Sequence, residues 1–139
     1  MEQDLVKSGH TTGECNLHLQ FTIAYRREVL RVEQMAALTK LYLKAAAARI
    51  NVEIAAIEVG PDHVHLFLRN WRRYSIPELA RRLKGFSSRM LRKRYFNLMK
   101  YYLWGKKFWS CGYFYRTVGA VTAEHVKRYI EETQTKHWA

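Results

Sequence analysis

The sequence predicts an α+β fold of the ferredoxin-like type, also seen in RNA-recognition modules, with an additional helix at the C-terminus. Three observations lead to it. Four short segments alternate apolar and polar residues, three longer segments repeat apolar residues at helical spacing, and their order is β-α-β-β-α-β-α. That order builds one four-stranded antiparallel sheet (βαββαβ) with two helices on one face. The other face of the sheet is expected to be open.

The first half of the chain predicts a strand, a helix and a second strand. Apolar and polar residues alternate from residue 15 to 24, which is the period of a half-buried strand. Residues 32–49 repeat apolar side chains at helical spacing and end in an alanine-rich stretch that favours helix. Alternation returns at 52–59. Residues 1–14 are polar, and we expect them to be flexible.

The middle of the chain predicts a hairpin and a capped helix. Gly60-Pro61-Asp62 is typical of a tight turn, and residues 63–69 alternate as the third strand. Ser75 and Glu78 have the spacing of a capping box, with a proline in the first turn, so a helix is expected to run from there to residue 95.

The last third predicts a fourth strand at 111–118 and a final helix that begins at Thr122. Residues 97–109 are aromatic and basic, and predict a loop with at most a short helical turn. With no repeat or low-complexity segment, residues 15–139 are expected to form a single domain.

Composition limits the function. The chain has 139 residues, 48% of them hydrophobic, without an apolar run of the roughly 18 residues that a membrane span needs. Two cysteines are too few for a disulfide scaffold, so we expect a cytoplasmic protein. The formal net charge is +12, and such an excess favours a polyanionic partner, most often nucleic acid.

Basic residues concentrate on the helix predicted after Ser75, where Glu78 is the only acid. A solvated surface is the alternative, but surface helices usually mix charges to form ion pairs. We therefore expect this helix to contact nucleic-acid phosphates through Arg81, Arg82, Lys84, Arg89, Arg92 and Lys93. Nearby aromatic residues are candidates for stacking on unpaired bases, although each is individually more typical of a core: Trp71, Tyr74, Tyr101, Tyr102, Trp104 and Trp109.

Two histidines begin the third strand. His63 and His65 are two residues apart, so they share one face of the strand while Val64, Leu66 and Leu68 point into the core. Two imidazoles held on a rigid strand form half of a divalent-metal site. The alternative is a pair of partly exposed polar side chains, and the spacing alone does not separate the two interpretations.

Tyr129 is the candidate nucleophile among nine tyrosines. On the last predicted helix it lies at the boundary of the apolar face, where a hydroxyl can reach a cleft. A structural tyrosine at the edge of the core is the alternative.

A series of motifs resembles the single-tyrosine HUH transposases of the TnpA type, which mobilise the smallest insertion sequences. The resemblance covers residues 15–134 and rests on Tyr25-Arg26-Arg27, Pro61-Asp62-His63-Val64-His65-Leu66, Leu83-Lys84-Gly85-Phe86-Ser87-Ser88-Arg89, Phe108-Trp109-Ser110-Cys111-Gly112-Tyr113-Phe114, Thr117-Val118-Gly119 and Arg128-Tyr129-Ile130-Glu131.

The resemblance implies a metal-assisted enzyme that cleaves and rejoins single-stranded DNA with hairpin ends. His63 and His65 would bind Mg²⁺ or Mn²⁺, and Tyr129 would attack the DNA to form a 5′-phosphotyrosine. A homodimer is also implied. The family commonly has a glutamine four residues after the tyrosine as a third ligand, but Thr133 stands there; Glu132 faces the correct side and is the candidate in its place.

Two alternatives to a mobile enzyme stay open at this point. The same chemistry would serve a domesticated relative that acts on repeated palindromes. A non-catalytic nucleic-acid-binding module would use the basic helix and aromatic residues alone, and the presence of both the histidine pair and Tyr129 argues against it.

Overall fold

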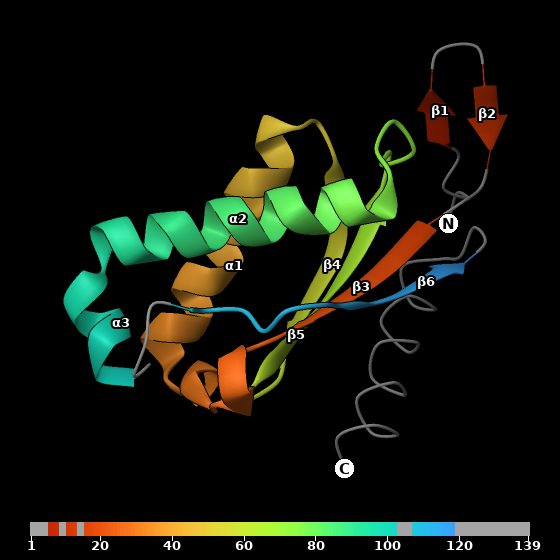
Figure 1. Cartoon of the computed structure of the whole chain (residues 1–139). Coiled ribbons are helices and arrows are strands. Elements are labelled where there is room, and N and C mark those ends of the chain that lie inside the picture. Colours follow the sequence, from red (N-terminus) through yellow and green to blue (C-terminus); the bar gives the residue numbers. More distant parts are fainter. Residues whose placement is uncertain (1–5, 9–10, 14–15, 103–106, 119–139) are drawn as a thin grey trace.

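A computed structural model describes residues 6–8, 11–13, 16–102 and 107–118 (Figure 1). Its main body is an α+β domain with a four-stranded antiparallel sheet in the order β4-β5-β3-β6, which confirms the predicted fold class. The elements of this body are β3 (Asn16–Thr22), the 3-10 turns η1 (Ala24–Arg26) and η2 (Val29–Arg31), α1 (Glu33–Arg49), β4 (Glu53–Val59), β5 (His63–Arg69), α2 (Ile76–Arg94), α3 (Phe96–Tyr102) and β6 (Phe114–Val118).

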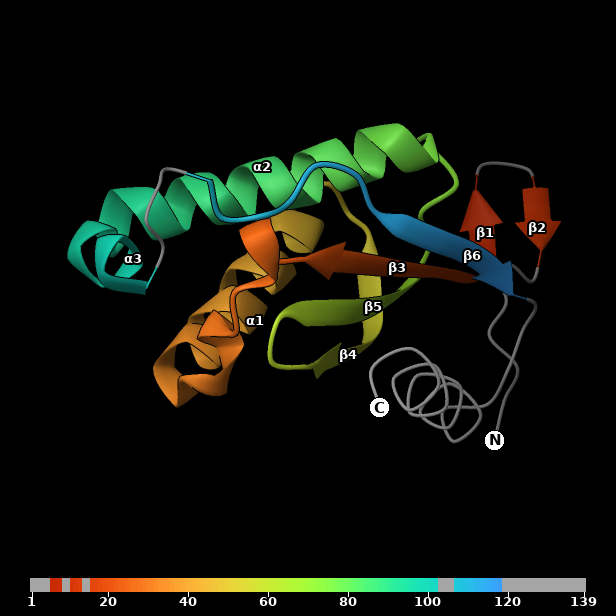
Figure 2. The same ribbon diagram turned by 60° about the horizontal axis from the view of Figure 1, so that its bottom comes forward.

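The two long helices form one layer against the sheet. Figures 1 and 2 show α2 running across the strands with α1 beside it. Ser75 caps α2 as the sequence predicts, because its hydroxyl accepts a hydrogen bond of 3.2 Å from the Glu78 amide. The bounds of α1 and α2 agree with the predicted helices to within one residue at each end.

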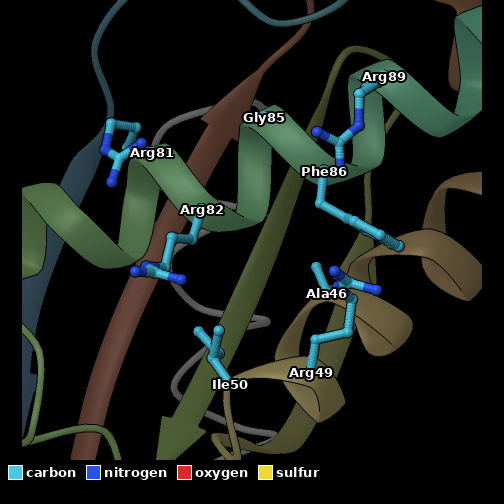
Figure 3. A pocket seen from close by; sticks show the side chains of 8 residues that line it. All are labelled: Ala46, Arg49, Ile50, Arg81, Arg82, Gly85, Phe86 and Arg89. Carbon is cyan, nitrogen blue, oxygen red and sulfur yellow. The ribbon is translucent and has the colours of Figure 1, made fainter.

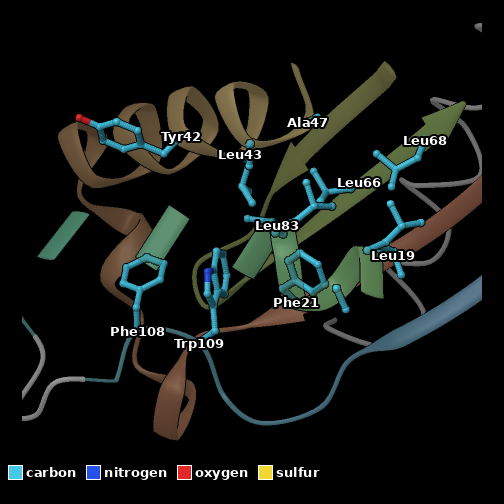
Figure 4. Close-up of a cluster of buried hydrophobic side chains, with 14 of the residues drawn as sticks. Leu19, Phe21, Tyr42, Leu43, Ala47, Leu66, Leu68, Leu83, Phe108 and Trp109 are labelled. Atoms are coloured by element: carbon cyan, nitrogen blue, oxygen red, sulfur yellow. The ribbon is translucent and has the colours of Figure 1, made fainter. Parts of the chain in front are cut away.

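The core lies between this helical layer and the inner face of the sheet (Figure 4). β3 and β5 are its centre, since each is flanked by a strand on both sides. Fully buried side chains from these strands pack on side chains from both helices and from the segment before β6: Leu17, Leu19, Phe21, Val64, Leu66, Leu68, Leu43, Leu79, Leu83 and Phe108. The predicted apolar face of β5 is therefore confirmed.

The pairing register determines which polar side chains meet on the opposite face. β3 and β5 are antiparallel, with His18 opposite Phe67, Gln20 opposite His65 and Thr22 opposite His63. Directly opposite residues share a face of a sheet, so this face carries all three histidines. It was predicted to be open, but His18, His63, His65 and Phe67 are each at most 1% exposed. Alternation tells which residues share a face, not whether that face is covered.

Three elements differ from the prediction. Residues 96–102 form a seven-residue helix, α3, where a loop with a short helical turn was expected. β6 begins at Phe114 rather than at residue 111, because Gly112 has a φ of 80°, outside the extended region, and pairing with β3 starts at Phe114. Two short strands, β1 (Val6–Ser8) and β2 (Thr11–Gly13), pair within the segment that was predicted to be flexible. Valine and threonine favour strands, which is consistent with that pairing.

The predicted final helix from Thr122 lies outside the described residues. Within the part of the chain that is described, no helix is long and apolar enough to cross a membrane.

Candidate functional site

His63 and His65 lie together at the start of β5, directly after the Gly60-Pro61-Asp62 turn. Their ring centroids are 4.9 Å apart and the ring planes meet at 85°. The prediction that the two imidazoles share one face is confirmed. The alternative of partly exposed polar side chains is wrong, because His63 is 1% and His65 0% exposed. The rings are buried as a pair, which needs a chemical reason.

Asp62 orients the first of these imidazoles. Its Oδ1 atom lies 2.9 Å from Nδ1 of His63, while its Oδ2 atom accepts a hydrogen bond of 3.2 Å from Nε of Arg26. Burial lowers the pKa of His63 below its usual value, and the contact with Asp62 opposes this only in part. The neutral imidazole is therefore favoured, with its Nδ1 proton donated to Asp62 and Nε2 as the electron-pair donor.

His18 orients the second imidazole from the neighbouring strand. Its Nε2 atom lies 2.8 Å from Nδ1 of His65, and the two rings are stacked with centroids 5.0 Å apart. Phe114 of β6 contacts His18 edge-on at 5.8 Å. Sequence reasoning placed His18 on the polar side of its strand but gave it no role. Its position depends on the register between β3 and β5, which alternation alone does not reveal.

The turn before β5 fits closely around His63. The Gly60 amide donates a hydrogen bond of 2.9 Å to the His63 carbonyl, which closes the turn. A Cβ atom at position 60 would lie 2.2 Å from Cε1 of the His63 ring, well inside contact distance. Glycine is thus required here by the imidazole packed against it, a reason more specific than turn formation.

A strained backbone brings Arg26 to Asp62. Tyr25 and Arg26 both have positive φ angles, 59° and 54°, although neither is glycine. Such conformations cost energy and cluster at functional sites. The 3-10 turn that contains them follows β3 directly, and it places the Arg26 guanidinium on the carboxylate that orients His63.

The donor set fits a divalent ion. Nδ1 of each imidazole is engaged, by Asp62 in one case and His18 in the other, so Nε2 is the nitrogen with which each ring would bind a metal. Within the described ranges, no three His, Cys, Asp or Glu side chains are arranged so that they could together hold a metal ion, so His63 and His65 supply only part of a coordination sphere. Tyr129 and Glu132, like Thr133, lie outside the described residues.

The basic helix α2 lies in the helical layer, on the opposite side of the sheet from the histidines. Five of its six predicted DNA-binding side chains are exposed: Arg81, Arg82, Arg89, Arg92 and Lys93. The sixth, Lys84, is partly buried and donates hydrogen bonds of 2.8 Å to the carbonyls of Ser110 and Gly112. Burial lowers its pKa. Lys84 thus fastens the chain before β6 onto α2.

Two of the aromatic residues proposed to stack on bases belong to the core instead. Trp71 is 8% and Trp109 4% exposed, and the Trp109 indole donates a hydrogen bond of 2.9 Å to the Ser87 hydroxyl. Tyr74 is half-buried and donates to the Ile50 carbonyl, whereas Tyr101 is 77% exposed. The side chains of Tyr102 and Trp104 lie outside the described part of the chain.

A ferredoxin-like sheet with two buried, oriented histidines and an exposed basic helix is the arrangement expected of the DNA transposases that the sequence motifs resemble. A family model described as "Transposase IS200 like" matches residues 11–133, and the chain belongs to that family. It is accordingly a DNA transposase, an enzyme that cleaves DNA.

Known relatives agree with this assignment. The chain is 37% identical over 119 residues to the ISDra2 transposase TnpA of Deinococcus radiodurans, covering 86% of this chain and 84% of the relative. It is 32% identical over 126 residues to the transposase for insertion sequence element IS200 of Salmonella typhimurium, with coverages of 88% and 82%.

Two solved structures share the fold. A crystal structure of a transposase from Deinococcus radiodurans R1 matches with a TM-score of 0.72 at 32% identity, covering 91% of this chain and 95% of that one. A REP-associated tyrosine transposase bound to a REP hairpin matches with a TM-score of 0.60, covering 95% of this chain and 73% of that one. At 15% identity, the second likeness concerns the fold alone.

Proposed function

We propose that this transposase cleaves and rejoins single-stranded DNA at the ends of an insertion sequence, through a 5′-phosphotyrosine on Tyr129 and with a divalent ion at His63 and His65. The observation that carries the proposal is the orientation of the two buried imidazoles, each engaged through Nδ1. A hydrogen bond at one ring nitrogen leaves the other nitrogen aimed in a fixed direction, which is the usual arrangement of a metal-binding histidine.

Mg²⁺ or Mn²⁺ is the proposed ion, held by His63, His65 and Glu132. When bound, it supplies positive charge that polarises the scissile phosphate. Imidazole is a less favoured ligand for such ions than oxygen, so a carboxylate from Glu132 suits the proposed site. Asp62 and His18 keep the two rings in the orientation that binding needs.

Tyr129 carries the covalent step of the proposal. Its phenolic oxygen attacks the phosphorus, the bond from phosphorus to the 3′ oxygen breaks, and the phenol proton is lost to solvent while the leaving oxygen becomes a 3′-hydroxyl. A 3′-hydroxyl from another strand end then attacks the phosphotyrosine and releases the tyrosine. The phosphodiester energy is stored in the protein linkage, so no nucleotide is consumed.

The proposed DNA partner is a single strand with hairpin ends. The exposed arginine and lysine side chains of α2 would contact the phosphates of this strand. Lys84 would contribute less, because its ammonium is already bound to two carbonyls. Affinity should then fall steeply with salt, at about 0.7 log units per log unit of salt for each phosphate contacted. We further propose a homodimer that works in the cytoplasm.

A labelled single-stranded oligonucleotide from the element end, incubated with and without Mg²⁺, tests this function. We expect a covalent adduct that requires Mg²⁺ and disappears in Tyr129→Phe and in His63→Ala. Tyr101→Phe is the matched control, since Tyr101 is 77% exposed and lies on α3. Adduct that persists in Tyr129→Phe would contradict the tyrosine assignment, and binding without cleavage would favour a non-catalytic module.

A second candidate is a domesticated transposase that acts on repeated palindromes. The same fold and the same proposed chemistry would serve it, so the two functions differ in their DNA substrate. A cleavage assay that offers the protein both a repeated genomic palindrome and an insertion-sequence end separates the two functions. Preferential cleavage of the genomic palindrome would indicate the domesticated role.

A further inference from the structure

A pocket of about 230 Å³ lies between α1 and α2, in the helical layer (Figure 3). Four arginines surround it, one from α1 and three from α2. Its lining is Ala46, Arg49, Ile50, Arg81, Arg82, Gly85, Phe86 and Arg89. The hydrophobic core and the sheet separate it from His63 and His65, so it is not part of the proposed metal site.

The charge of the pocket is not balanced within the described residues. No carboxylate is among the lining residues, and Glu78 pairs with two of the four arginines, Arg81 at 2.7 Å and Arg82 at 2.8 Å. Among the ion pairs of the described chain, none includes Arg49 or Arg89. Two of the four guanidinium groups therefore share one carboxylate, and the other two form no ion pair within the described residues. Like charges gathered this closely repel unless an anion lies between them.

Phe86 holds two of the arginines in place. The Arg49 guanidinium carbon lies 4.8 Å from the centre of the Phe86 ring, and that of Arg89 lies 5.7 Å from it. Figure 3 shows Phe86 and Arg82 pointing from α2 towards α1, where Arg49 and Ile50 form the facing wall. Stacking on an aromatic ring reduces the freedom of a guanidinium, which lowers the entropic cost of binding an anion.

Gly85 forms an open part of the pocket wall. It lies in the interior of α2, where glycine destabilises a helix by about 1 kcal/mol relative to alanine. Packing within the described residues does not require it, because a Cβ atom there would meet nothing within 4 Å. A glycine without a packing role lets a ligand approach the backbone closely.

We propose that this pocket binds a phosphate group, held by Arg49, Arg82 and Arg89 against the backbone at Gly85. The planar fork of arginine matches phosphate oxygens, and the pocket is too small for a larger organic ligand. A DNA backbone or a small free polyphosphate can supply the group. Only the first source rests on the proposed DNA-binding function.

Calorimetric titration with inorganic pyrophosphate tests the inference. EDTA is present throughout, so that no metal at the histidines contributes. We expect saturable binding of one pyrophosphate per chain, weakened at least about tenfold in Arg49→Gln, since a charged hydrogen bond contributes about 1.5–3 kcal/mol. Lys44→Gln is the matched control. It removes an exposed charge from α1, the helix that carries Arg49, outside the pocket, and should change the affinity by less than about twofold.

Gly85→Ala is the second variant. It should raise the melting temperature, as alanine favours helix, and yet weaken pyrophosphate binding, because its methyl group enters the pocket. A role limited to folding would not move these two quantities in opposite directions. Absence of saturable binding at millimolar pyrophosphate, or an affinity of Arg49→Gln equal to that of Lys44→Gln, would overturn the inference.

Competition identifies the source of the phosphate. If pyrophosphate displaces a fluorescent single-stranded oligonucleotide and Arg49→Gln weakens both ligands, the DNA backbone occupies the pocket. If both ligands bind together, a small free polyphosphate does. These measurements involve no cleavage, so their failure is distinguishable from failure of the Tyr129 adduct assay.

Discussion

Nε2 of His18 on β3 lies 2.8 Å from Nδ1 of His65 on β5, so one buried histidine fixes the ring of another across two neighbouring strands. Together with the contact between Asp62 and His63, this gives both imidazoles of the pair the same kind of support. One partner comes from the adjacent residue in the chain and the other from a different strand.

Replacing His18 should weaken metal binding more than folding. In His18→Leu the contact to His65 is lost, and we expect Mn²⁺ affinity to fall about 10- to 100-fold, the usual effect of removing a residue that orients a metal ligand. Electron paramagnetic resonance of free Mn²⁺ measures this directly. His18→Gln, which keeps a polar group near Nδ1 of His65, should recover part of the affinity. Unchanged Mn²⁺ binding in His18→Leu would show that His18 does not orient the site.

Gly60→Ala should displace the His63 ring. The new methyl group would lie 2.2 Å from Cε1 of an imidazole that is 1% exposed and held by Asp62, so the ring must move. We expect Mn²⁺ affinity to fall by about tenfold or more with little change in circular dichroism. Gly85→Ala is the control for metal binding, because its methyl group meets nothing within 4 Å. Equal Mn²⁺ affinities in the two variants would contradict the described packing at Gly60.

Lys84→Ala should destabilise the fold. Its ammonium donates to the carbonyls of Ser110 and Gly112, and hydrogen bonds from a charged group contribute about 1.5–3 kcal/mol. We expect urea denaturation to show a loss of this size. Lys93→Ala, which changes an exposed lysine of the same helix, should stay within about 0.5 kcal/mol. If both variants are equally stable, the hydrogen bonds from Lys84 do not stabilise the fold.

Cys111 should be alkylated at lower pH than an ordinary cysteine. The Lys107 ammonium lies 3.0 Å from its Sγ atom and lowers the pKa of the thiol. The thiolate is the reactive form, so a lowered pKa moves the midpoint of the rate profile to lower pH. Iodoacetamide labelling followed by peptide mass spectrometry measures that profile. Lys107→Gln should shift the midpoint to higher pH, and an unchanged profile would exclude this contact in solution.

The sequence predicted what depends on local pattern. Period-2 alternation placed His63 and His65 on one face, and the capping box at Ser75 located the start of α2. Contacts between distant segments were not predictable in this way. The support from His18 needs the register of β3 on β5, and the two bonds from Lys84 span 26 and 28 residues.

The arginine pocket was missed for the same reason. The sequence identified the basic residues of α2, but Arg49 belongs to α1 and meets them only when the two helices pack together. The helix α3 lacked a signal of its own, since its aromatic residues show no apolar period that would separate a short helix from a loop.

The central claim is that Tyr129 forms a covalent bond to the 5′ phosphate of a cleaved single strand. Its most direct test is mass spectrometry of the protein after reaction with a single-stranded element end and Mg²⁺, digestion with protease and nuclease, and sequencing of the modified peptide. The account predicts a nucleotide 5′-phosphate on the peptide that contains Tyr129. A modification on any other tyrosine, or cleaved DNA with no modified peptide, would contradict it.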